Sequence, residues 1–232
     1  MILPPLIAGR LLRRYKRFLA DVELEDGTQI TAHTANPGAM TGLATPGSRV
    51  LLSHHPHGKR KLPYSWQIVY VGRTPVGVNP ALANPLVREA LERGVIAELR
   101  GYPHLHAEVP VGDSRLDFEL SAPGRPRCLV EVKSVTLRDG SAGLFPDAPS
   151  ERGRRHLHEL ATLVAAGERA ALLFLVQRGD VRRVGPAREV DPAYGVALDE
   201  ARAAGVEVLA YRAAVEPSRR RIRVVGRLPL LD

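Results

Sequence analysis

The chain has 232 residues and carries a formal net charge of +8. Its single cysteine, Cys128, excludes an intrachain disulfide and a cysteine metal cluster. No apolar stretch is as long as a membrane span, and no apolar leader is present, so we expect a cytoplasmic protein without a membrane partner. The excess of positive charge favours a polyanionic partner, because binding to nucleic acid releases condensed counterions.

Short strand-like runs separated by turn signals fill the first eighty residues. Asp26-Gly27 lies between two alternating segments, which is a strong hairpin signal. The predicted strands are 17–25, 28–34, 49–53, 66–72 and 75–78. Several short strands in so few residues predict a small barrel, and the oligonucleotide-binding (OB) type is one such barrel. We therefore expect an OB-like, nucleic-acid-binding β-barrel over residues 1–80.

Basic residues gather in four clusters, at 10–17, 54–61, 152–155 and 219–223. A single cluster is usually solvated surface, whereas four in one chain favour a nucleic-acid partner. Barrel aromatics can stack on bases, although most are expected in the core. The aromatic pair beside the Lys-Arg-Lys run is the better candidate for contact. The predicted nucleic-acid contacts are Arg14, Arg17, Lys59, Arg60, Lys61, Tyr64, Trp66, Arg152 and His156.

Beyond residue 80 the pattern mixes helices and strands, which indicates an α/β (α+β) domain over residues 81–232. Asn84 is predicted to cap a first helix and Ser150 a second, and 191–204 is predicted as a third. The run 169–177 is apolar throughout, as expected of a central strand covered on both faces. The other predicted strands are 105–109, 115–120, 129–133, 206–211 and 221–225. Helix, three strands, helix, strand is the order of the restriction-endonuclease-like core.

Two of these strands, 115–120 and 129–133, carry ionisable side chains that are candidates for a catalytic site. Leu116, Phe118 and Leu120 are predicted to share one face of their strand, so that Asp117 points to the other. The apolar face is expected to pack in the core of the domain. The carboxylate of Asp117 is then available on the opposite face.

The next strand carries Glu131 and Lys133, which are two residues apart and therefore share a face. If the hairpin is symmetric about Gly124, Asp117 lies opposite Glu131 with the side chains roughly 5 Å apart. Two carboxylates this close repel each other unless a proton or a cation separates them. A divalent metal, Mg²⁺ or Mn²⁺, is the expected occupant.

Asp followed by Glu-x-Lys on a hairpin is the pattern of the PD-(D/E)xK nuclease fold. Magnesium needs only one or two carboxylates besides substrate phosphate, and a lysine can orient the attacking water. The alternative is an exposed Glu-Lys pair with Asp117 hydrogen-bonded locally, since short motifs occur by chance. Lysine is rare in this chain, at four of 33 basic residues, and Lys133 stands at this one strand position. That scarcity favours a chemical role for a compact point charge.

An acid from the first helix often completes such a metal site, and Glu89 is the predicted residue, with Glu98 as the alternative. On the second helix, Arg152, His156 and Glu159 share one face by their spacing. That face is predicted to serve the same site or to receive a phosphate at the helix start. An ordinary capped surface helix is the other interpretation.

Several segments resemble the sugar fermentation stimulation protein A (SfsA) family. They are 33–40 (HTANPGAM), 64–66 (YSW), 77–79 (GVN), 114–118 (SRLDF), 130–137 (VEVKSVTL) and 145–148 (FPDA). The resemblance implies an N-terminal OB-like barrel, a C-terminal nuclease-type domain and sequence-nonspecific DNA binding. It also implies a regulatory link to sugar (maltose) metabolism.

Two functions follow. The first is a Mg²⁺- or Mn²⁺-dependent deoxyribonuclease in which Asp117 and Glu131 hold metal and Lys133 assists attack. The second is a non-catalytic DNA-binding regulatory protein. The first is favoured, because two acids beside a polyanion repel phosphate unless a cation bridges them. The choice between DNA and RNA, the strand form and the oligomeric state stay open.

Overall fold

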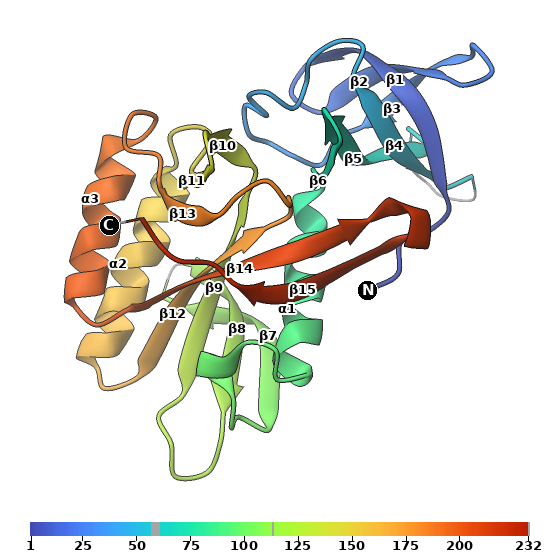
Figure 1. Ribbon diagram of the computed structural model, residues 1–232. Helices are drawn as coiled ribbons and strands as arrows, with labels where there is room; N and C mark the ends of the chain where they lie inside the picture. Colours follow the sequence, from blue (N-terminus) through green and yellow to red (C-terminus); the bar gives the residue numbers. More distant parts are fainter. Residues whose placement is uncertain (57–60, 113, 232) are drawn as a thin grey trace.

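The computed structural model describes residues 1–56, 61–112 and 114–231 (Figure 1). Two β-rich bodies follow one another along the chain. The first, drawn in blue and teal, is a barrel, and the second, drawn from green to red, is a sheet with helices on its faces. Within the described ranges, no helix is both long and apolar enough to cross a membrane.

The barrel is built by five strands in the order β3-β2-β1-β4-β5, and the parallel pairing of β3 with β5 closes it. A sixth strand, β6, extends the sheet beyond β5. The interior is filled by apolar side chains that include Leu11, Met40 and Trp66. The predicted OB-like barrel is confirmed. Its strands are β1 (Leu6–Tyr15), β2 (Leu19–Leu24), β3 (Gln29–His33), β4 (Arg49–His54), β5 (Tyr64–Val71) and β6 (Thr74–Gly77).

The sequence prediction omitted β1, which pairs with both β2 and β4. Its basic residues were interpreted as a surface cluster. In the structure Arg10 and Arg13 are exposed while Leu11 between them is fully buried, so the segment alternates as a strand does. The charged residues lie on the outer side of the barrel wall and the apolar ones on the inner side.

The second body is centred on a six-stranded sheet of order β15-β14-β12-β9-β8-β7. The apolar strand β12 runs parallel to both of its neighbours, as predicted for a central strand. The elements are α1 (Ala83–Glu92), β7 (His104–Val111), β8 (Ser114–Ser121), β9 (Cys128–Val135), α2 (Glu151–Ala165), β12 (Arg169–Val176), α3 (Pro192–Ala203), β14 (Glu207–Glu216) and β15 (Arg221–Arg227). The predicted order of helix, three strands, helix, strand is confirmed.

Short elements complete this body. Three short 3₁₀ turns are η1 (Pro80–Leu82), η2 (Ala97–Leu99) and η3 (Pro217–Arg219). A small sheet of β10 (Leu137–Asp139), β11 (Ala142–Phe145) and β13 (Arg183–Pro186) was not predicted. Strands of three or four residues are too short for an alternating pattern to identify them.

The two faces of the large sheet have separate cores. Helices α2 and α3 cover one face, and α1 with part of the barrel covers the other. Leu51 and Ile68 of the barrel share this second core with Leu86 and Phe118. Since one apolar core spans both bodies, we infer that they are held rigidly against each other.

One predicted pattern on β8 is wrong. Phe118 and Leu120 pack in the core beneath α1, whereas Leu116 packs in the core beneath α2 and α3. On the neighbouring strand β7, Glu108 has a left-handed φ of 60° and lies beside this point of β8. Such a backbone conformation interrupts the regular strand, so the alternation does not continue through Asp117.

Candidate active site

The hairpin of β8 and β9 has the register predicted from symmetry about Gly124. Phe118 pairs with Val130 and Leu120 with Cys128. The next step in this register sets Asp117 against Glu131. The backbone N–H of Val132 donates to Oδ2 of Asp117 at 2.7 Å, which fixes the carboxylate beside β9.

Glu131 is almost fully buried, at 4% exposure, and its two oxygens differ. Oε1 accepts hydrogen bonds from Nζ of Lys133 at 2.7 Å and from Nδ1 of His156 at 2.5 Å. Oε2 is buried and has no hydrogen-bond partner in the part of the chain that the structure describes. A buried carboxylate oxygen without a donor is costly unless a cation binds it.

His156 lies on α2 and is 1% exposed. Nε of Arg152 donates to Nε2 of its ring at 3.4 Å. This places the ring hydrogen on Nδ1, from which it is donated to Glu131. The predicted helix face thus contributes to the site, because His156 orients the glutamate and Arg152 orients the histidine.

The surroundings of Asp117 disfavour the charged form of its carboxylate. Burial, followed by the negative charge of Glu131, raises the pKa of Asp117 to about 6, against the opposing effect of its hydrogen bonds. Nδ2 of Asn84, in the first turn of α1, donates to Oδ1 at 2.6 Å. A carboxylate that two donors orient, and whose charge is disfavoured by its surroundings, is suited to bind a cation.

The pKa of Glu131 shifts in the opposite direction to that of Asp117. Burial alone would raise its pKa, but the hydrogen bond from His156 and the positive charge of Lys133 outweigh burial and lower it. The buried pair therefore holds one carboxylate that is readily ionised and one that is protonated more easily. Such divergent environments are typical of functional sites.

These residues fit a divalent cation. Among the described residues, no group of three or more His, Cys, Asp or Glu side chains is arranged to hold a metal. Two carboxylates nevertheless suffice for Mg²⁺, which keeps several waters and takes its other oxygens from substrate phosphate. The free Oε2 of Glu131 and the carboxylate of Asp117 are the donors that the structure offers.

A cavity of about 460 Å³ opens beside Asp117. Two exposed arginines, Arg115 and Arg152, line it together with Ser114. Glu108 also lines the cavity, and its carboxylate pairs with Arg115 at 3.1 Å. Guanidinium groups bind phosphate bidentately, and Arg152 keeps donors beyond the one that it gives to His156.

The structure does not support Glu89 as a third acid of this site. Its carboxylate forms ion pairs with the amino group of Met1 at 2.6 Å and with Arg93 at 3.2 Å. The alternative, Glu98, accepts from the hydroxyl of Tyr211 and pairs with Arg227. Both predictions chose an acid by its position on a predicted helix, and spacing alone cannot show which side chain points toward β8.

The residue of α1 that reaches the site is Asn84, and the sequence prediction gave it another role. It was predicted as a helix cap, but the helix begins at Ala83 with Leu82 at the cap position. The preceding η1 is capped by Asn79 instead. The Asn-Pro pair is a common helix-start signal, and nothing in it indicates a partner 33 residues away.

The basic residues predicted to bind nucleic acid have several different environments. Arg14 donates to the carbonyls of Arg17, Asn36 and Gly38 at 2.7–3.0 Å, and Arg17 donates to the carbonyl of Pro37 at 2.7 Å. These guanidinium groups fasten the loop 36–39 rather than presenting all their donors to solvent.

Of the other residues predicted to contact nucleic acid, some lie in the core and others on the surface. Trp66 is fully buried in the barrel, so the prediction of a base contact on its exposed face is wrong. Tyr64 stacks on His54 with 4.5 Å between ring centroids, and Lys61 is exposed. Lys59 and Arg60 lie outside the described residues.

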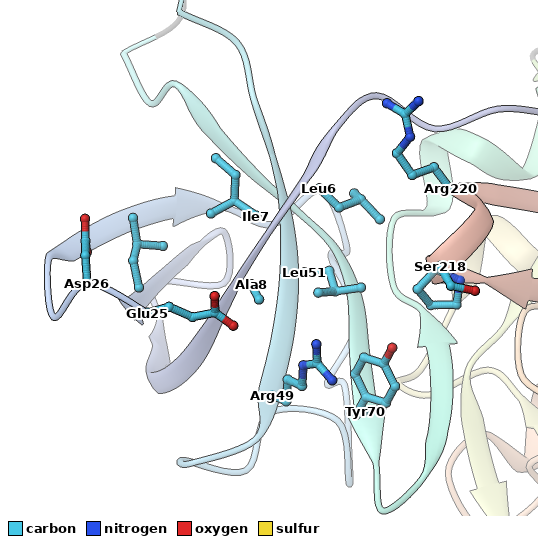
Figure 2. Close-up of a pocket in the computed structure, with 12 residues that line it drawn as sticks. Leu6, Ile7, Ala8, Glu25, Asp26, Arg49, Leu51, Tyr70, Ser218 and Arg220 are labelled. Atoms are coloured by element: carbon cyan, nitrogen blue, oxygen red, sulfur yellow. The ribbon is translucent and has the colours of Figure 1, made fainter.

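A second, larger cavity of about 820 Å³ lies between the barrel and the tip of the β14–β15 hairpin. Figure 2 shows Arg49 and Tyr70 side by side on its barrel wall, with Ser218 and Arg220 on the side of the hairpin. The guanidinium of Arg49 lies 5.0 Å from the centre of the Tyr70 ring. The carboxylates of Glu25 and Asp26 also line this cavity, just as those of Glu108 and Asp117 line the smaller one, so the balance of charge does not distinguish the two cavities. The smaller cavity adjoins the carboxylate that the backbone of β9 holds in place.

Comparison with known proteins identifies the family of this chain. Residues 81–219 match the model of the sugar fermentation stimulation protein RE domain, and residues 12–78 match that of the SfsA N-terminal OB domain. A sugar fermentation stimulation protein homolog of Geobacter sulfurreducens is 52% identical over 233 residues, which cover 100% of this chain and 99% of the relative. The chain belongs to the SfsA family.

Two further SfsA relatives extend the comparison. A homolog from Thioalkalivibrio sulfidiphilus is 54% identical over 218 residues, 92% of this chain and 91% of the relative. The solved structure of Pyrococcus furiosus SfsA in complex with Ca²⁺ superposes with a TM-score of 0.91 at 29% identity, covering 100% of this chain and 98% of that one. The predicted family and the predicted fold class, an OB-like barrel followed by a restriction-endonuclease-like domain, are confirmed.

Proposed function

We propose that this SfsA family member binds DNA and hydrolyses its phosphodiester bonds with a divalent cation, Mg²⁺ or Mn²⁺. Residues 1–80 grip the polymer and residues 81–232 carry the reaction. The observation that carries the proposal is Oε2 of Glu131, which is buried and has no donor among the described residues, beside a second carboxylate whose pKa is raised to about 6. The Ca²⁺ complex of the P. furiosus relative supports a divalent cation in the family.

Each residue of the site has a separate task in this reaction. Asp117 and Glu131 would hold the cation, which when bound acidifies water and neutralises charge on the phosphodiester. Lys133 donates one N–H to Glu131, and its other two can orient the attacking water or a phosphate oxygen. Asn84 and His156 keep the two carboxylates in place, while Arg115 and Arg152 attract the flanking phosphates.

The test is cleavage of labelled single-stranded and duplex DNA with Mg²⁺ or Mn²⁺. Asp117→Asn and Glu131→Gln should abolish cleavage, and Lys133→Met should reduce it by at least a hundredfold, because each removes a donor or ligand of the reaction. Glu119→Gln is the matched control, since Glu119 lies on the same strand as Asp117 but pairs with Arg127. Its activity should equal that of the unmodified protein.

DNA binding is measured separately, in EDTA and at several salt concentrations. Binding that weakens with salt, together with no cleavage for any metal or strand form, would contradict the catalytic claim. That outcome would leave the alternative function, a non-catalytic DNA-binding regulatory protein linked to sugar (maltose) metabolism.

A further inference from the structure

A cavity of about 670 Å³ lies where the barrel meets the segment that leads into α1. Its walls are mostly apolar and come from three stretches of chain: Leu3 and Pro4 at the start, Leu62 before β5, and Leu82 before α1. Pockets of this size and character, at a junction between domains, are typical small-ligand sites.

Hydrogen-bonded side chains form the polar side of the cavity, and the donor and the acceptor of each amide can be assigned. The backbone N–H of Ala81 donates to Oδ1 of Asn79, so Nδ2 of Asn79 donates to Oε1 of Gln67 at 2.9 Å. Nε2 of Gln67 then donates to the hydroxyl of Ser53 at 2.9 Å, and that hydroxyl contacts Nε2 of His55. One backbone N–H thus fixes the orientation of both amides.

The amides of Asn79 and Gln67 keep hydrogen-bonding groups that can recognise a ligand. An amide group has two donor hydrogens and two acceptor lone pairs. Asn79 uses one of each on its partners, and so does Gln67, which leaves each amide one donor and one acceptor. An adjacent donor and acceptor complement the free edge of a nucleobase.

We infer that this cavity binds the base of an unpaired nucleotide. The apolar walls accept the faces of the base and the amides of Asn79 and Gln67 accept its edge. Every base has an adjacent donor and acceptor on its Watson–Crick edge, so the pocket takes any base but only from a strand that is not paired there. Lys61, which also lines the cavity, supplies positive charge for the phosphate.

The place of the pocket in the chain connects it to the metal site. Leu82 borders the pocket, and two residues later Asn84 binds Asp117. A base held here anchors the strand beside the two carboxylates. The inference rests on the proposed function for the identity of the polymer, and it adds the requirement for an unpaired nucleotide.

The protein carries its own reporter for this pocket. Trp66 is the only tryptophan in the chain, and although it is fully buried and cannot stack on a base, it borders the pocket, so its fluorescence responds to a ligand there. A mixed-sequence, 12-nucleotide single strand should quench its fluorescence in EDTA, where no metal-dependent cleavage occurs. Ala81→Phe fills the cavity from an exposed position, and it should weaken binding about tenfold and remove the quenching.

Ala97→Phe is the matched control, because Ala97 is an exposed alanine in another 3₁₀ turn and does not line the pocket. It should bind and quench as the unmodified protein does. Asn79→Asp is a second variant that keeps the acceptor for Ala81 but places a negative charge in the pocket, and it should weaken binding as well. Unchanged melting temperatures verify that the variants are folded.

A 12-nucleotide strand that is abasic at every position completes the test, because it keeps the phosphates and offers no base in any register. It should bind the unmodified protein about tenfold more weakly than the intact strand, and Ala81→Phe should bind both strands equally. Equal binding and quenching by Ala81→Phe, or quenching by maltose in place of the oligonucleotide, would overturn the pocket assignment. Quenching without cleavage in Mg²⁺ would instead refute the nuclease proposal and leave the pocket intact.

Discussion

Glu131 shows how one side chain serves two purposes in a buried site. Its Oε1 accepts two hydrogen bonds, from Lys133 and His156, which stabilise the ionised form, and its Oε2 has no hydrogen-bond partner among the residues that the structure describes. The surroundings of Asp117 instead favour its protonated form. The ionised form of Asp117 therefore destabilises the fold at neutral pH.

The pH dependence of stability tests this imbalance. The pKa of Asp117 is about 6 when folded and near 3.8 when unfolded, so the folded state binds more protons between these values. The free energy of unfolding should fall as pH rises through this window, on the order of 2–3 kcal/mol. Asp117→Asn should remove this pH dependence, because an amide does not titrate. Asn84 can rotate its amide so that its oxygen accepts a hydrogen bond from the new Asn side chain.

Urea unfolding in EDTA from pH 4 to pH 8 measures the effect. The variant should gain stability relative to the unmodified protein as pH rises, and 5 mM Mg²⁺ should stabilise only the unmodified protein. A stability difference that does not change with pH would contradict the assigned role of Asp117.

Strand periodicity located Glu131 and Lys133, and the symmetry of the turn about Gly124 located Asp117, because both need only local information. The alternation predicted for the strand that carries Asp117 was wrong, since Leu116 and Phe118 pack in different cores. The structure brings these three together, and their catalytic role stays a prediction. The contributions of Asn84 and His156 depend on where α1 and α2 pack against the sheet, and the spacing of residues in the sequence does not reveal that packing.

At the scale of elements, Asp191 connects the two helices that cover the α2–α3 face of the sheet. It caps α3 by accepting from the N–H of Tyr194, and it accepts from the N–H of Ser150, which in turn caps α2. Arg154 of α2 forms an ion pair with the same carboxylate at 3.1 Å. One buried side chain thus sets the position of the helix that carries His156.

Asp191→Ala should lower the free energy of unfolding by about 2–4 kcal/mol, because it removes a cap and leaves Arg154 without its partner. Ser150→Ala removes only a cap and should cost about 1 kcal/mol. Urea denaturation at pH 7 measures both. Equal losses in the two variants would show that the connection between the helices adds nothing.

The cap at Ser150 was predicted from sequence, since a capping residue acts within a few positions of itself. For the third helix only the range 191–204 was predicted, and the structure shows that Asp191 caps it. Strand β1 was missed because its arginines hid the alternation of its apolar residues. The small sheet of β10, β11 and β13 was missed because its strands are too short to carry a pattern.

At the scale of the whole molecule, a loop of the barrel rests on the segment that precedes α2. The N–H of Met40 donates to Oδ2 of Asp147 at 3.2 Å, and a Cβ at Gly38 would overlap the same carboxylate. Arg14 holds this loop through backbone carbonyls. The barrel thereby contacts the segment that leads into α2, the helix whose His156 orients Glu131.

Gly38→Ala should force these two segments apart, lowering the free energy of unfolding by about 1–3 kcal/mol and reducing cleavage of DNA. Adding Asp147→Ala makes room for the new methyl group, so the double variant should be more stable than Gly38→Ala alone. Thermal unfolding and the cleavage assay measure the two effects. A Gly38→Ala protein that behaves like the unmodified one would refute the contact.

The order of elements in the sequence was enough to predict both bodies, and the boundary at residue 80 stays a prediction. The contact between Gly38 and Asp147, and the core that the barrel shares with α1, join residues far apart in the chain. No local pattern encodes such pairings.

The first residues of the chain are held by some of the last. The N–H of Leu3 donates to the carbonyl of Arg220 at 2.6 Å, and Ile222 donates to Met1 at 3.1 Å. A ribosome adding about 5–20 residues per second needs roughly 10–40 s to make the intervening chain. Residues 1–3 therefore meet these partners only when synthesis is nearly finished, whereas the barrel strands from Leu6 to Gly77 have all their partners much earlier.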